Sequence, residues 1–188
     1  MTNGYFANPL IFIIDTLFYL YMLIIALRLL MPWVMWNTQH PLPQLIIRAT
    51  QPPVAPLKQV LPTVGKLDTA VLVLLLLVAL FKLLLVGVIA GASPNIIALL
   101  PLVIAEIFSL FITLFTITII VEVVLSWLSP PGSYNPVQDL IVRLNAPLLN
   151  PVRRRMPELG GIDLSPLVVI IGLQVLAMLV LPLLTGRL

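Results

Sequence analysis

Cysteine is absent from this chain of 188 residues, histidine occurs once, and only 9% of the residues are charged. The missing cysteines exclude disulfides, iron–sulfur clusters, thiolate metal sites and covalent haem attachment. The single histidine, His40, excludes a bis-histidine haem or multi-histidine metal site within one chain, so we expect no cofactor. Because soluble globular proteins carry about 25% charged residues, this scarcity of charge indicates an integral membrane protein.

Four apolar runs predict transmembrane helices at residues 9–31, 69–92, 101–128 and 164–185. About 20 apolar residues cross the hydrocarbon core, and helices satisfy their own backbone hydrogen bonds in lipid. The third run begins at residue 96, and Pro101 is expected to start its helix because proline is favoured in the first turn. Ser165 followed by Pro166 predicts the N-cap and first turn of the fourth helix. The predicted fold class is all-α integral membrane.

The polar connection at residues 135–163 repeats the connection at residues 40–68 with a constant offset of 95. The residues that recur are, in the second copy, Pro136, Leu140, Ile141, Arg143, Pro147, Pro151, Pro157, Gly160 and Asp163. Four prolines in register indicate an internal duplication. We therefore predict two tandem repeats, at residues 9–92 and 96–185, each with two spans.

Each connection is predicted to contain a short amphipathic helix at the membrane surface. Its apolar residues recur at helical spacing and are, in the second copy, Val137, Leu140, Ile141 and Leu144. Asn135 is expected to cap this helix, and Pro147 and Pro151, like Pro52 and Pro56 in the first copy, are expected to end it. Gly160 and Gly161 predict a tight turn. The predicted caps of the following spans are Asp68 and Asp163.

Seven of the ten basic residues lie in the two connections. By the positive-inside rule, both connections face the cytoplasm and both termini lie outside a bacterial inner membrane. Tandem two-helix units keep one orientation, so a pseudo-two-fold axis along the membrane normal is expected. Nucleic-acid binding is not expected, because no aromatic residues alternate with the basic ones. The candidate binding residues for anionic headgroups or a partner membrane protein are Arg48, Lys58, Arg143, Arg153, Arg154 and Arg155.

Charged residues inside a membrane are costly and often functional; here they are Asp15, Arg28, Lys82, Glu106 and Glu122. Arg28 and Glu122 each precede a tryptophan by five residues, so we expect them to pair. Lys82 is expected to reach Asp15, which lies at a similar depth. Glu106 is expected near the outer face, where water can solvate it.

Two further patterns leave alternatives open. Glu106 begins a polar stripe with Ser109, Thr113 and Thr116, which fits either an ion path or ordinary hydrogen bonding between helices. Gly87 and Gly91 form a GxxxG pattern, which indicates a close helix contact within the chain or a homo-oligomer.

The second connection carries the most specific motifs, which are Asn135-Pro136, Pro147-Leu148, Pro151-Val152-Arg153-Arg154 and Gly160-Gly161-Ile162-Asp163. Together with the tandem pattern, they resemble the YggT family of bacterial inner-membrane proteins, which has relatives called YlmG in other bacteria and in chloroplasts. The resemblance implies links to maturation of a cytochrome complex and its haem in chloroplasts, and to osmotic or ion stress and cell division in bacteria. It implies no catalytic residue.

Two functions stay open. The first is a non-enzymatic membrane scaffold or assembly factor that acts through its cytoplasmic basic segments. The second is a small oligomeric ion-transport or osmotic-stress-related channel component. An enzyme is not expected, because the sequence contains no nucleophile–base pair, metal cluster or phosphate-binding loop.

Overall fold

The computed structural model describes residues 3–36, 38–92, 95–128, 135–156 and 163–186. The described residues form six α-helices and no strand. The helices are α1 (Asn3–Val34), α2 (Pro41–Val60), α3 (Thr69–Ile89), α4 (Ile96–Leu128), α5 (Pro136–Arg153) and α6 (Ser165–Thr185). Four of them, α1, α3, α4 and α6, are long and apolar enough to cross a membrane, which confirms the all-α class and the four spans. The turn predicted at Gly160 and Gly161 lies outside the described residues.

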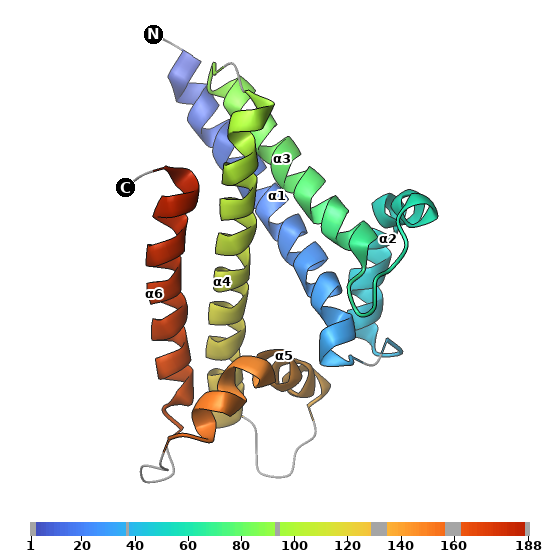
Figure 1. Ribbon diagram of the computed structural model, residues 1–188, viewed down its shortest axis with the longest axis vertical. Coiled ribbons are helices and arrows are strands. Elements are labelled where there is room, and N and C mark those ends of the chain that lie inside the picture. Colours follow the sequence, from blue (N-terminus) through green and yellow to red (C-terminus); the bar gives the residue numbers. More distant parts are fainter. Residues whose placement is uncertain (1–2, 37, 93–94, 129–134, 157–162, 187–188) are drawn as a thin grey trace.

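Figure 1 shows α5 across the lower ends of the long helices and α2 beside the lower parts of α1 and α3. Helix α3 packs against α1 and α4, and α4 packs against α6. Both chain termini lie at the end opposite α5 (Figure 1). The chain therefore places its two polar connections toward one end of the bundle and both termini toward the other.

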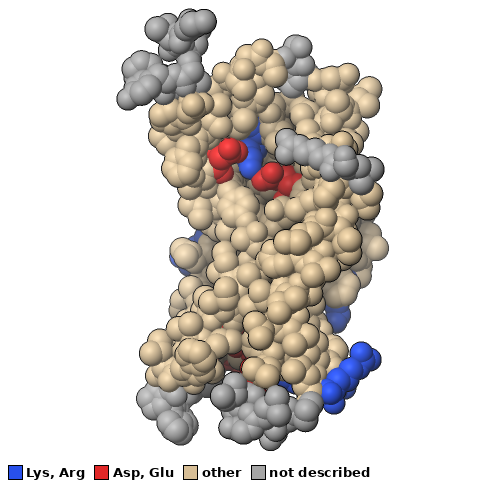
Figure 2. All heavy atoms as spheres, turned by 90° about the vertical axis from the view of Figure 1, so that its left-hand side faces the viewer, with Lys and Arg blue, Asp and Glu red and all other residues tan. Residues whose placement is uncertain are grey.

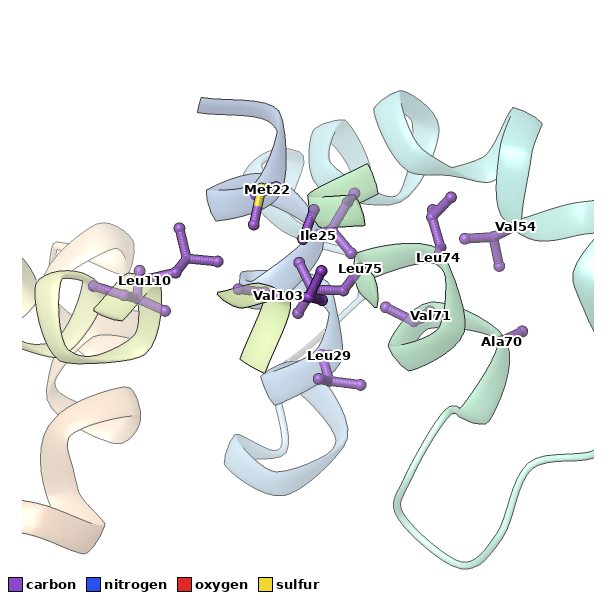
Figure 3. Close-up of a cluster of buried hydrophobic side chains, with 13 residues drawn as sticks. Met22, Ile25, Leu29, Val54, Ala70, Val71, Leu74, Leu75, Val103 and Leu110 are labelled. Atoms are coloured by element: carbon purple, nitrogen blue, oxygen red, sulfur yellow. The ribbon is translucent and has the colours of Figure 1, made fainter. Parts of the chain in front are cut away.

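The largest apolar core joins α1, α2, α3 and α4 (Figure 3). Met22, Ile25, Leu75, Val54 and Leu110 are completely buried within it. Because lipid tails are as apolar as these side chains, close van der Waals packing holds such a core together, with little help from the hydrophobic effect. The outward-facing side chains of the same helices are apolar and exposed, as a lipid-facing surface requires.

Helix α4 begins at Ile96 and not at Pro101, so the predicted start of the third span is wrong. The side-chain oxygen of Asn95 accepts a hydrogen bond from the backbone N–H of Ile97 at 3.0 Å. This bond caps the helix five residues before the proline. Pro101 then removes only one hydrogen bond from an otherwise apolar helix, and the helix continues through it.

Helix α6 begins at Ser165, with Leu164 in the N-cap position, so the prediction that Ser165 is the cap is wrong. The carboxylate of Asp163 accepts hydrogen bonds from the backbone N–H and the hydroxyl of Ser165. The carboxylate is a stronger acceptor than a hydroxyl, so Asp163 binds the first helical N–H and the helix begins at Ser165, one residue earlier than a cap at Ser165 would place it.

The prolines expected to end the short helices instead lie inside them: Pro52 and Pro56 in α2, and Pro147 and Pro151 in α5. Proline kinks a helix without always ending it. Val54 and Leu149 follow the first prolines and are fully buried, so tertiary packing holds the second part of each helix in place. The short helices are therefore longer than the sequence predicted.

Helix α3 ends at Ile89, and Gly91 follows it with a positive φ of 76°. Glycine adopts this left-handed conformation without steric cost, which suits the residue after a helix. Gly87 and Gly91 therefore do not form one helical face. The GxxxG pattern gives no support for a homo-oligomer.

Candidate functional site

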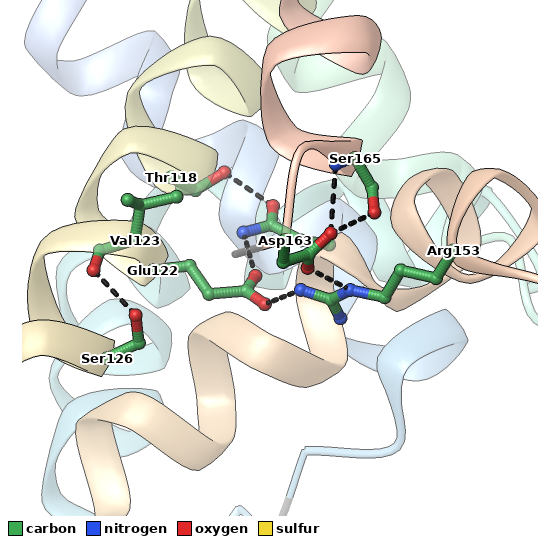
Figure 4. A network of polar contacts seen from close by, with 8 residues as sticks. Thr118, Glu122, Val123, Ser126, Arg153, Asp163 and Ser165 are labelled. Atoms are coloured by element: carbon green, nitrogen blue, oxygen red, sulfur yellow. Dashed lines mark hydrogen bonds and ion pairs between the residues drawn. The ribbon is translucent and has the colours of Figure 1, made fainter. Parts of the chain in front are cut away.

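Arg153, at the end of α5, connects three helices (Figure 4). Its Nη2 donates a hydrogen bond to Glu122 of α4 at 3.1 Å, and its Nε donates to Asp163 at 2.7 Å. Asp163 in turn accepts from Ser165 at the start of α6. One guanidinium therefore joins the ends of α4, α5 and α6.

Arg153 and Asp163, the two residues of this cluster that lie outside the spans, each stabilise the charged form of the other. Burial by itself raises the pKa of Asp163, but its hydrogen bonds from Ser165 and Arg153 outweigh burial and lower that pKa below its ordinary value. Burial by itself lowers the pKa of Arg153, but the hydrogen bonds and charges of Asp163 and Glu122 raise it above its ordinary value. The Arg153–Asp163 pair is therefore fully ionised at neutral pH.

Glu122 also binds Asn145, a completely buried residue of α5. Asn145 Nδ2 donates to Glu122 Oε2 at 2.8 Å, and Asn145 Oδ1 accepts from the hydroxyl of Thr118 at 2.8 Å. Both side-chain groups of the amide are thus satisfied within the protein. Because Glu122 is 5% exposed, these donors replace the water that its carboxylate loses on burial.

Arg28 occupies a corresponding place in the first half of the chain, at the end of α1. Its Nη1 donates to Thr50 Oγ1 at 2.6 Å and to the carbonyl of Ile47 at 3.2 Å, and its Nη2 donates to Gln51 at 2.7 Å. The predicted Arg28–Glu122 ion pair is therefore wrong. Each charge instead binds the short helix that follows its own span: Arg28 binds Thr50 and Gln51 of α2, and Glu122 binds Asn145 and Arg153 of α5.

The contacts of the two halves correspond at the offset of the sequence repeat. Lys58 pairs with Asp68 at 2.5 Å, as Arg153 pairs with Asp163. Asp68 accepts a hydrogen bond from the backbone N–H of Val71 and so caps α3. At the start of α5, Asn135 accepts from the backbone N–H of Val137 at 3.0 Å. The two long helices that follow the connections, α3 and α6, therefore each have an aspartate that accepts from a backbone N–H of their first turn and pairs with a basic residue.

A second charged cluster lies among α1, α3 and α4, nearer the chain termini. Lys82 Nζ lies 2.5 Å from Glu106 Oε1 and 3.3 Å from Asp15 Oδ1. The expected Lys82–Asp15 ion pair is present, but Glu106 is paired with the same ammonium and is not simply solvated. Figure 2 shows the acidic and basic atoms together in a hollow of the surface. This triad carries one net negative charge.

An open groove of about 640 Å³ lies between the end of α1 and the outer face of α5. Its basic residues are Arg143, Arg154 and Arg155. Arg143 pairs with Asp139 at 2.9 Å, one turn earlier. Arg154 and Arg155 make no ion pair with any residue in the described ranges. Within the described residues, the positive charges of Arg154 and Arg155 in the groove are therefore not paired with an acidic side chain.

Exposed apolar side chains line the same groove. Trp33 is 58% exposed and Met35 is 70% exposed. Met35 has a positive φ of 53°, a conformation that is unusual for a residue with a side chain. It turns the chain after α1, so that the indole N–H of Trp36 donates to the carbonyl of Leu140 at 3.0 Å. The turn thereby fixes α1 against α5 and forms one wall of the groove.

Of the basic residues predicted to bind, the structure brings Arg143, Arg154 and Arg155 together. It assigns Lys58 and Arg153 to ion pairs with helix-capping aspartates. Arg48 is exposed on α2, outside this groove. The groove therefore contains Arg143, Arg154 and Arg155 but not the other basic residues that the sequence predicted to bind.

Sequence reasoning missed Thr50 and Asn145, the buried polar residues that bind Arg28 and Glu122. They lie 95 positions apart, as do the residues of the repeated motif. A polar residue at the same place on both amphipathic helices was the signal that would have found them.

The helical bundle and its charged connections define a multi-pass helical membrane protein. The family model described as CCB3/YggT matches residues 7–89 and again residues 101–184. The chain therefore belongs to the CCB3/YggT family.

The curated relatives extend over almost the whole chain. An uncharacterized protein of Pseudomonas aeruginosa is 40% identical, over 91% of this chain and 87% of the relative. The uncharacterized protein YggT of Escherichia coli is 32% identical, over 91% of this chain and 88% of the relative. An uncharacterized protein of Haemophilus influenzae is 32% identical, over 87% of each. No solved structure matches the chain.

Proposed function

We propose that this protein is a non-enzymatic scaffold or assembly factor of the bacterial inner membrane. In this proposal the groove bounded by Arg143, Arg154 and Arg155 binds an acidic segment of a partner membrane protein. The observation that carries it is that Arg154 and Arg155, which form no ion pair within the described residues, lie beside exposed Trp33 and Met35. Arginine and aromatic residues are enriched where proteins bind one another.

The proposed orientation places α2 and α5 in the cytoplasmic headgroup layer and both termini in the periplasm. The basic residues of the connections support this orientation through the positive-inside rule. Leu42 and Leu45 of α2 are 42% and 65% exposed, which suits a helix whose apolar side faces lipid. At the offset of 95 residues, their counterparts in α5 differ from each other. Val137 is 40% exposed like Leu42, whereas Leu140 is 6% exposed and packs inside the protein.

We also infer that the chain consists of two tandem units in parallel orientation, residues 9–92 and 96–185. The family model matches once in each half. Equivalent ion pairs, Lys58–Asp68 and Arg153–Asp163, and the equivalent buried residues Thr50 and Asn145 support the duplication. The groove belongs mainly to the second unit, so the two units have diverged in their surface.

Site-specific photocrosslinking in intact membranes tests the scaffold. A photoreactive residue in place of Met35 lies in the groove and is exposed in the wild type. We expect one reproducible crosslinked membrane protein, and we expect at least a fivefold loss of it in the variant Arg154→Gln/Arg155→Gln. Arg48→Gln, an exposed change on α2, is the control and should retain it. Crosslinks to lipid alone would overturn the proposed protein partner.

One observation favours the alternative function, an oligomeric ion-transport component. The Asp15–Lys82–Glu106 triad lies in the membrane-spanning part, between cavities of about 270 and 390 Å³ that are lined by Asp15 and Lys82 and by Glu106. Purified protein in liposomes tests it. Ion flux that is lost in Glu106→Gln, and retained in the surface variant Arg48→Gln, would favour transport over the scaffold.

A further inference from the structure

A second cavity, of about 630 Å³, lies at the junction of α4, α5 and α6, and it shares no lining residue with the basic groove. Its volume falls within the range of about 300–1,000 Å³ that is typical of ligand sites. It is lined by Glu122, Val123, Ser126, Trp127, Arg153, Asp163 and Pro166. Figure 4 shows four of its polar residues, Glu122, Ser126, Arg153 and Asp163, from close by.

The formal charges of the lining side chains sum to one negative charge, since Glu122 and Asp163 are acidic and Arg153 is basic. Each carboxylate oxygen has two acceptor sites. Glu122 Oε1 and Asp163 Oδ2 each accept one bond from Arg153, and Glu122 Oε2 accepts one from Asn145. Ser165 fills both sites of Asp163 Oδ1. Within the described residues, acceptor capacity therefore stays on both oxygens of Glu122 and on Asp163 Oδ2. The cavity therefore favours a ligand that brings one positive charge and N–H donors, as an ammonium group does.

Arg153 offers donors to the same ligand. Its Nε and Nη2 bind the two carboxylates, while Nη1 makes no hydrogen bond within the part of the chain that the structure describes. Its side chain is 35% exposed. A guanidinium with free N–H groups binds phosphate oxygens well. One side of the cavity thus suits a phosphate, and another suits an ammonium.

The surroundings of the cavity are those of a membrane interface. Trp127 is 80% exposed beside Leu128, which is 72% exposed, and Leu167 of α6 is 57% exposed next to the lining residue Pro166. Tryptophan is enriched at the level of lipid headgroups. Acyl chains attached to a ligand in the cavity would meet apolar side chains that the protein leaves uncovered.

We propose that this cavity binds the headgroup of a zwitterionic phospholipid with a primary ammonium, a phosphate ester of the ethanolamine type. Arg153 binds the phosphate, and Glu122 and Asp163 accept hydrogen bonds from the ammonium. A trimethylated choline headgroup cannot donate those bonds. A glycerol headgroup brings only negative charge to a site that is already negative. The bound lipid links the ends of α4, α5 and α6.

Native mass spectrometry of the purified full-length protein tests this proposal. The protein is offered phosphatidylethanolamine, phosphatidylcholine and phosphatidylglycerol with identical acyl chains, and soluble phosphoethanolamine separately. We expect phosphatidylethanolamine to bind at least tenfold more tightly than each of the other three. Equal binding of the choline lipid, preference for the glycerol lipid, or equally tight binding of soluble phosphoethanolamine would overturn the assignment.

Cavity-filling variants locate the bound lipid. Within the described residues, the hydroxyl of Ser126 donates to the carbonyl of Val123 and forms no ion pair. Ser126→Phe therefore fills the cavity without removing a charged contact. It should weaken phosphatidylethanolamine binding at least tenfold. Val124→Phe adds the same ring to an exposed position of α4 outside the lining and should leave binding unchanged. Unchanged binding by a folded Ser126→Phe protein refutes the site. If that variant fails to fold, Trp127→Ala serves instead and should weaken binding at least threefold; unchanged binding refutes the site equally.

Discussion

Replacement of Asn145 by alanine tests whether the buried amide stabilises the charge of Glu122. Asn145 is completely buried, and it donates to Glu122 at 2.8 Å and accepts from Thr118 at 2.8 Å. The variant removes both hydrogen bonds. It leaves a carboxylate that is 5% exposed with Arg153 as its remaining donor.

The magnitude follows from these two bonds. A hydrogen bond to a charged group contributes about 1.5–3 kcal/mol, and a neutral one contributes about 0.5–1.5 kcal/mol. The free energy of unfolding should therefore fall by roughly 2–4 kcal/mol in Asn145→Ala. For a chain of this size, 1 kcal/mol corresponds to about 2–4 °C in the unfolding temperature. A decrease of roughly 5–15 °C is expected for the detergent-purified protein.

A double-mutant cycle isolates the Asn145–Glu122 interaction. Asn145→Ala, Glu122→Gln and the double variant are compared by equilibrium unfolding in one detergent, and a coupling energy of about 1 kcal/mol or more is expected because one partner is charged. Gln174→Ala is the control, since its 3.4 Å hydrogen bond to Thr116 is exposed and should contribute less than about 0.5 kcal/mol. Additive effects of the two single variants would refute this interpretation of the buried pair.

Three further predictions concern the other charged clusters. The pKa of Asp163 is lowered in the folded protein, so its carboxylate stabilises the fold at pH values above the ordinary pKa of aspartate. This stabilisation is lost as the pH falls through the lowered pKa of the folded state. The unfolding temperatures of Asp163→Asn and wild type should therefore differ at pH 7 and converge below about pH 4. Arg153→Met should lower the unfolding temperature more than Lys58→Met, because Arg153 joins two carboxylates and Lys58, with a 39% exposed side chain, joins one; equal decreases would contradict this. Lys82→Met leaves the carboxylates of Asp15 and Glu106 without their ammonium, which should lower the free energy of unfolding by up to about 3–5 kcal/mol. Adding Asp15→Asn should recover part of that loss, as measured by urea unfolding. A further decrease in the double variant would show that charge does not hold the triad together.

Much of the fold could be predicted from local properties of the chain. A run of about 20 apolar residues crosses a membrane wherever it occurs, so the four spans follow from length and composition alone. The repeated connection followed from comparing the chain with itself. The side chains of Asp68 and Asn135 accept hydrogen bonds from residues two or three positions ahead, and such short-range contacts are readable from sequence order.

The extent of the short helices was not predictable in this way. Proline signals a helix end locally, but α2 and α5 continue because Val54 and Leu149 are buried against other helices. Burial of that kind depends on residues far away in the sequence. The same holds for the groove, which exists because Trp36 ties the end of α1 to α5.

The sequence by itself determined the class of this protein, its four spans and the side on which its basic connections gather, because these depend on composition and order along the chain. Only the tertiary structure decided the partner of each charge. Arg28 binds α2, Glu122 binds Asn145 and Arg153, and Glu106 joins Lys82. These choices depend on how each helix is rotated and tilted against its neighbours. Side-chain packing sets that geometry, and depth along a span does not reveal it.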